Sequence, residues 1–129
     1  MNRSTEMPFA EFWARYLVHH RRPATRAFHS AGSLVCLLGL ALAVALRSPW
    51  PLWVAASLGY FCAFAGHWWV ERNQPLTFSS PIRAAICNWL LFGVELRGLF
   101  GAPGFNRTLA RALVLAPIAI SGCSDIGGQ

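Results

Sequence analysis

Residues Ala27 to Leu46, AFHSAGSLVCLLGLALAVAL, form a run of twenty residues without a single Asp, Glu, Lys or Arg. A helix rises by about 1.5 Å per residue, so this run makes about 30 Å of helix, the thickness of the hydrocarbon core of a bilayer. The run therefore predicts a helix that is long enough to cross a membrane.

A second apolar run follows after a short break. Ser48-Pro49-Trp50-Pro51 predicts a tight turn with a tryptophan at the membrane interface, and Leu52 to Val70 supplies a second run of comparable length. We interpret the pair as a transmembrane hairpin. Five arginines precede the first run and place the N-terminus inside by the positive-inside rule: Arg3, Arg15, Arg21, Arg22 and Arg26.

Shorter helices are predicted on either side of the hairpin. Pro8 suits a first helical turn, and apolar residues recur at helical spacing from Phe9 to Leu17, which predicts an amphipathic helix. Such a helix lies in the membrane interface or packs on the protein's own core, and the pattern is the same for both. Two later apolar segments, Ile82 to Val94 and Ala112 to Ser121, are shorter than a span needs, and Pro117 interrupts the latter. Re-entrant or interfacial helices are therefore favoured over two further spans.

These elements together predict an all-α fold. We expect a small integral membrane helical bundle, folded as one domain over residues 1–129, with a flexible tail at 122–129.

The composition agrees with a membrane location, because 55% of the residues are hydrophobic and only 12% are charged. The basic residues are eleven arginines and no lysine, and they abut apolar segments. Nucleic-acid binding is disfavoured, since that function needs basic residues on a polar face. The lysine-free usage indicates a GC-rich bacterium and hence its plasma membrane; in a eukaryote the endoplasmic reticulum is expected.

Candidate metal ligands lie at the ends of the two apolar runs. His67 and Glu71 are four residues apart and share a helix face, and the hairpin returns them to the level of His29, with His20 nearby. An ordinary hydrogen bond between imidazole and carboxylate has the same spacing, so this pair alone does not distinguish a metal site from a simple hydrogen bond. His19 points about 100° away from His20 in a helix, which favours His20 as the ligand. Three imidazoles and a carboxylate suit iron, zinc or copper, with Glu71 either a direct ligand or the acceptor that orients His67.

Three arginines adjoin these residues. Arg22, Arg26 and Arg72 are candidates for a bidentate hold on the carboxylate of a substrate. Each also has the alternative role of a headgroup charge that sets membrane topology.

Three sequence blocks resemble a known family: YLVHHRRP at residues 16–23, RAFHSAGS at 26–33 and GHWWVERNQP at 66–75. Over about residues 9–101 the chain resembles the 2-hydroxy fatty acid dioxygenase family of small membrane proteins. The resemblance implies an Fe(2+)-dependent enzyme that uses O2 to shorten long-chain 2-hydroxy fatty acids by one carbon, in α-oxidation. The family's histidines map onto His20, His29 and His67. The chain departs from the family at His19, where an acid is frequent, and at Asn88, where many members have Asp.

Two functions from different classes therefore remain. The first is the iron-dependent dioxygenase, with 2-hydroxy fatty acid, O2 and the lipid bilayer as its partners. The second is a non-catalytic membrane protein with a structural or lipid-organising role, in which the histidines only join helix ends. Metal content separates the two.

Overall fold

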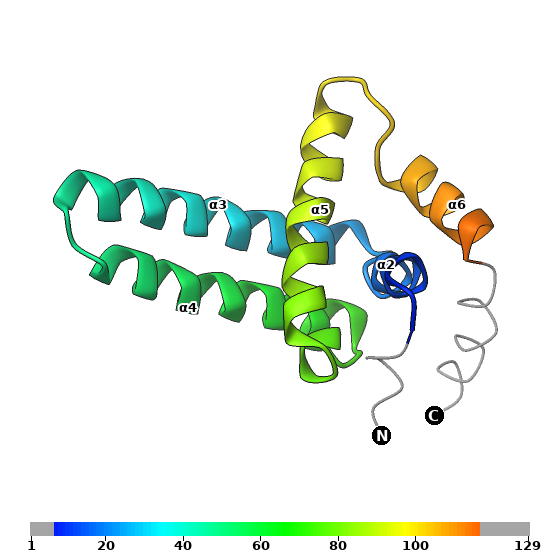
Figure 1. The fold of residues 1–129 in the computed structure, drawn as a ribbon, viewed down its shortest axis with the longest axis horizontal. Coiled ribbons are helices and arrows are strands. Elements are labelled where there is room, and N and C mark those ends of the chain that lie inside the picture. Colours follow the sequence, from blue (N-terminus) through cyan, green and yellow to red (C-terminus); the bar gives the residue numbers. More distant parts are fainter. Residues whose placement is uncertain (1–6, 117–129) are drawn as a thin grey trace. The chain divides into compact units, whose positions relative to one another are not determined.

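The computed structural model describes residues 7–116, which form five α-helices and two shorter helical segments, with no strand in that range (Figure 1). The predicted all-α fold is confirmed for these residues. Two compact units are formed, one by His20–Pro75 and the other by the described parts of Met1–His19 and Leu76–Gln129. The predicted tail at 122–129 and residues 117–121 of the last predicted segment lie outside the described residues.

The first unit is the helical hairpin. Helix α3 (Pro23–Leu46) and helix α4 (Trp50–Ala65) lie side by side and antiparallel, and α4 continues into η1, a π-helix over Gly66–Glu71 (Figure 1). Pro23 occupies the first turn of α3, where its missing N–H costs nothing, so the helix begins one turn before the predicted Ala27. Arg47 ends α3 in the left-handed conformation, with φ 50°, and turns the chain toward α4.

The two helices of the hairpin approach each other backbone to backbone. A Cβ atom added to Gly32 would lie 2.7 Å from the carbonyl oxygen of Gly59, and one added to Gly59 would lie 2.7 Å from Cys36 Sγ. Small residues permit such close contact between two helix backbones. This crossing lies three residues, about one helical turn, beyond His29.

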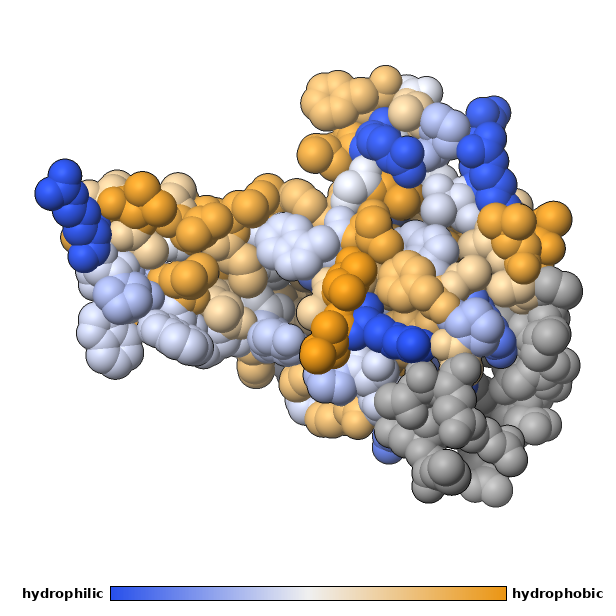
Figure 2. All heavy atoms as spheres, viewed as in Figure 1, coloured by the Kyte–Doolittle hydropathy of each residue, from blue (hydrophilic) through white to orange (hydrophobic). Residues whose placement is uncertain are grey.

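The outer surface of the hairpin is apolar. Of the described helices, α3 is long and apolar enough to cross a membrane. Figure 2 shows orange and pale side chains along the hairpin, with a strongly hydrophilic side chain at its turn end on the face drawn. The exposed large apolar side chains include Leu34, Leu37, Leu38, Leu40, Leu42, Val44 and Leu46 on α3, and Trp53, Val54, Leu58 and Phe61 on α4.

The second unit has its own hydrophobic core. It contains α2 (Phe9–Val18), the short 3₁₀ turn η2 (Leu76–Phe78), α5 (Pro81–Leu99) and α6 (Phe105–Leu115). The core includes Phe12, Tyr16 and Leu17 of α2, Cys87 and Leu91 of α5, and Phe105 and Ala112 of α6. The apolar face of α2 thus packs on the protein's own core, one of the two alternatives that its pattern allowed.

Both later helices differ from the apolar segments that predicted them. Helix α5 continues past Val94 to Leu99, because charged residues such as Glu95 propagate a helix as well as apolar ones do. Helix α6 begins at Phe105, seven residues before the predicted Ala112. Its first half is amphipathic, so an uninterrupted apolar run marks only its end.

Candidate metal centre

Three histidines of the hairpin unit are buried together. His20 lies in the turn that precedes α3, His29 lies in the second turn of α3, and His67 is the second residue of η1. Their exposed fractions are 0%, 6% and 2%. Buried imidazoles normally have hydrogen-bond or metal partners, so the question is what these rings face.

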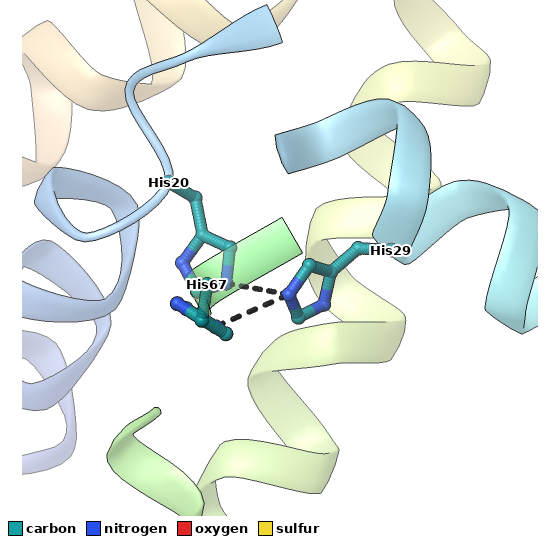
Figure 3. A group of neighbouring side chains, drawn as sticks. All are labelled: His20, His29 and His67. Carbon is teal, nitrogen blue, oxygen red and sulfur yellow. Dashed lines mark hydrogen bonds between the residues drawn. The ribbon is translucent and has the colours of Figure 1, made fainter. Parts of the chain in front are cut away.

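The three rings converge through the same kind of atom (Figure 3). His29 Nε2 lies 3.1 Å from His20 Nε2 and 3.2 Å from His67 Nε2, and the three ligand nitrogens all lie within 4.8 Å of one another. Ligand nitrogens about 2.1 Å from one ion are separated by about 3.0 Å at right angles and about 3.4 Å in a tetrahedron. The two measured separations fall inside this interval.

The positions of the protons on the rings also favour a metal ion between the three Nε2 atoms. His67 Nδ1 lies 2.7 Å from Asn73 Oδ1 and donates its proton there, so the neutral ring presents a lone pair at Nε2. His29 Nε2 carries at most one proton and can bridge to only one of its two neighbouring nitrogens. A metal ion accepts a lone pair from all three rings, so the donor set fits a metal.

Local structure brings His67 to this place. A Cβ atom added to Gly66 would lie 3.2 Å from Phe28 Cβ and 3.4 Å from Thr25 Cγ2, so glycine lets η1 approach the first turns of α3. The π-helix adds a residue per turn, a deviation that is frequent at functional sites. His67 therefore arrives beside His29 through a close helix contact and a local change of helix type.

The loop that carries His20 is held by two of the predicted site residues. The backbone N–H of Arg22 donates to Glu71 Oε1 at 2.8 Å. Arg26 Nη1 donates to the carbonyl oxygens of Arg21, at 2.6 Å, and His20, at 3.2 Å. Glu71 is not one of the three residues whose ligand atoms converge.

The other predicted site residues lie around this loop and the end of η1. Arg22 and Arg72 are exposed, whereas Arg26 is half-buried. His19 is buried at the end of α2 and does not belong to the convergent group. Asn88 lies half-buried on α5 in the second unit.

The sequence reasoning gave no role to Asn73, although the GHWWVERNQP block contains it. The amide pairs with the His67 ring, six residues earlier in the chain. The only signal for this contact was a polar residue shortly after a candidate ligand.

Fold and site together define a small all-α protein with a three-histidine candidate metal centre at the end of an apolar hairpin opposite its turn. Residues 7–100 match the family described as 2-hydroxy-palmitic acid dioxygenase Mpo1-like, and the chain belongs to this Mpo1-like family. All three histidines lie within the matched residues. The resemblance drawn from the three sequence blocks is thereby confirmed. Neither the curated proteins nor the solved structures give a match to this chain.

Proposed function

We propose that this chain is an integral membrane, Fe(2+)-dependent dioxygenase that uses O2 to shorten long-chain 2-hydroxy fatty acids by one carbon. The observation that carries the proposal is the convergence of three buried Nε2 atoms. It occurs in a member of a family described by a 2-hydroxy-palmitic acid dioxygenase activity.

In this proposal His20, His29 and His67 hold the iron. When bound, iron supplies the O2 chemistry that amino-acid side chains lack, and three protein ligands leave positions open for substrates. The packing around the buried rings keeps the ligands in place. Glu71 acts on the centre through the His20 loop, because its carboxylate accepts the Arg22 N–H.

The substrate carboxylate is assigned to Arg22 and Arg72. Both side chains are exposed, and the hydrogen bond from Arg22 N to Glu71 brings the two backbone positions together. A guanidinium can hold a carboxylate with two parallel hydrogen bonds. Arg26 is a weaker candidate, since its Nη1 already donates to two carbonyl oxygens. The acyl chain then runs along the apolar outer face of the hairpin.

The membrane part of the proposal rests on the two ends of the hairpin. Exposed tryptophans occur at both ends, Trp50 and Trp53 near the turn and Trp68 and Trp69 in η1. Trp50 and Trp69 are separated by about 28 Å along a helix, close to the thickness of the hydrocarbon core, as expected for two aromatic belts.

The arginines of the hairpin unit give its orientation. Arg47 lies at the turn, whereas Arg21, Arg22, Arg26 and Arg72 lie at the histidine end. The histidine end therefore faces the cytoplasm in this proposal. A bacterial plasma membrane is the proposed location, and residues 1–129 act as one domain.

Metal analysis and turnover together test the proposal. The protein is purified anaerobically in detergent, loaded with Fe(II), and incubated with a long-chain 2-hydroxy fatty acid and O2. We expect about one iron per chain and a product one carbon shorter. His29→Ala and His67→Ala should lose both, whereas His19→Ala, which removes a buried histidine outside the group, should keep the iron.

A folded protein that binds no Fe(II) and gives no shortened product would overturn the dioxygenase proposal. The non-catalytic membrane role would then replace it.

A further inference from the structure

Asn73 contacts His67 at two points. Its Oδ1 lies 2.7 Å from Nδ1 of the ring, and its backbone N–H donates to the His67 carbonyl oxygen at 3.1 Å. Arg72 makes this possible, because its left-handed conformation, φ 57° and ψ 38°, turns the chain back at the end of η1. One residue thus holds both the main chain and the ring of a candidate ligand.

We propose that Asn73 is a positioning residue that fixes the tautomer of His67. This inference rests on the proposed function and deepens it. A neutral imidazole carries one proton, and only the nitrogen without it can bind a metal. By accepting the Nδ1 proton, Asn73 leaves the lone pair on Nε2, the atom that faces His29 Nε2 at 3.2 Å. Without this acceptor the proton can occupy Nε2 and block the site.

The choice of an amide has its own consequence. Metal-bound histidines commonly pair their second nitrogen with a carboxylate, a backbone carbonyl or water, and a carboxylate makes the ring a stronger donor. The nearest carboxylate in sequence, Glu71, is already engaged with Arg22 N. A neutral amide fixes the ring without adding negative charge, so it holds the metal less tightly than a carboxylate would and leaves it more electron-poor.

Three variants test this role. Asn73→Leu keeps the branched shape of the side chain and removes the acceptor. Asn73→Asp keeps an acceptor and adds charge. Gln74→Leu is the matched control, because it removes the amide of the neighbouring, exposed residue.

Two measurements are made on each variant. Anaerobic competition with a chelator gives the affinity for Fe(II), and ¹⁵N NMR of the histidine rings in the metal-free protein gives the tautomer of His67. Loss of an acceptor of this kind typically weakens metal binding 10- to 100-fold. We expect that loss, together with a changed His67 tautomer, in Asn73→Leu. Asn73→Asp should bind Fe(II) at least as tightly as the wild type, and Gln74→Leu should match the wild type in both measurements.

The outcomes separate this inference from the proposed function. Wild-type affinity in Asn73→Leu, or equal losses in the Leu and Asp variants, would overturn the positioning role. If the wild-type protein itself binds no Fe(II), the proposed function fails. The tautomer measurement on metal-free protein still decides, in that case, whether Asn73 fixes the ring.

Discussion

The contact between the two hairpin helices at Gly39 gives a prediction of definite sign. A Cβ atom at this position would lie 2.1 Å from Ala55 Cβ and 2.9 Å from the carbonyl oxygen of Pro51. Carbon atoms in contact are separated by about 3.5 Å, so Gly39→Ala must push the helices apart by about 1.4 Å. Both obstructing atoms are backbone or Cβ atoms, which cannot rotate away.

The magnitude follows from two opposing effects. Overpacking of a well-packed contact typically costs about 1–3 kcal/mol, whereas alanine is better than glycine in a helix interior by about 1 kcal/mol. An approach of 2.1 Å is a severe clash, so the overpacking cost should lie at the upper end of its range, about 2–3 kcal/mol. The net expectation is a loss of about 1–2 kcal/mol, or a melting temperature lower by about 4–8 °C. Gly93 of α5 offers the matched control, because an added Cβ there meets no atom within 4 Å. Gly93→Ala should therefore raise stability by about 0.5–1 kcal/mol.

Thermal unfolding in detergent measures both variants. Adding Ala55→Gly to Gly39→Ala removes the 2.1 Å contact, and the double-mutant cycle should show about 1 kcal/mol of favourable coupling. If Gly39→Ala melts at or above the wild-type temperature, the two helices do not pack as described.

The remaining predictions concern three separate residues. Thr25 is fully buried, and its Oγ1 has no hydrogen-bond partner among the described residues. Thr25→Val should therefore keep or raise the melting temperature of the metal-free protein, and a loss of more than about 1 kcal/mol in the free energy of unfolding would reveal a hydrogen bond. Arg72→Gly suits the left-handed backbone, φ 57°, and should leave stability within about 1 kcal/mol of wild type while KM for the fatty acid rises about tenfold; an unchanged KM would exclude Arg72 as a carboxylate ligand. Burial raises the pKa of the Cys87 thiol to about 12, with Arg83 opposing, so at pH 8 a variant whose only cysteine is Cys87 should resist alkylation until it is unfolded. Because the unfolded thiol ionises first, near its ordinary pKa of 9.0, stability should fall above pH 9 by up to about 1.4 kcal/mol per pH unit, and Cys87→Ala should abolish this component in parallel melts.

The hairpin could be predicted because its signals are local. The charge-free run that ends at Leu46 and the proline-rich break after it predict a helix, a turn and a second helix. The structure contains all three, as α3, the turn after Arg47 and α4. The start of helix α6 was predicted seven residues too late, because its first half is amphipathic and contains no uninterrupted apolar run. An uninterrupted apolar run is a signal for burial on all sides, and an amphipathic helix lacks it.

The three histidines of the site were among the predicted ligands, whereas Asn73 was missed for a geometric reason. His67 and Glu71, at a spacing of four, share one face of an α-helix, whereas position 73 lies about 240° around from His67. In the structure Asn73, and not Glu71, contacts the His67 ring. The chain leaves η1 at Arg72 and folds Asn73 back onto that ring. That exit depends on a left-handed arginine, which no spacing rule predicts.

The three histidines converge only when the hairpin has folded completely. They come from a loop, a helix and a π-helical turn, and His29 lies 9 positions after His20 and 38 positions before His67. They meet only when the two long helices have closed on each other, so a chain with one helix out of place has no complete set of ligands. Binding of an ion to such a set is coupled to folding. If the site holds a metal ion as proposed, metal uptake would depend on correct assembly of the hairpin.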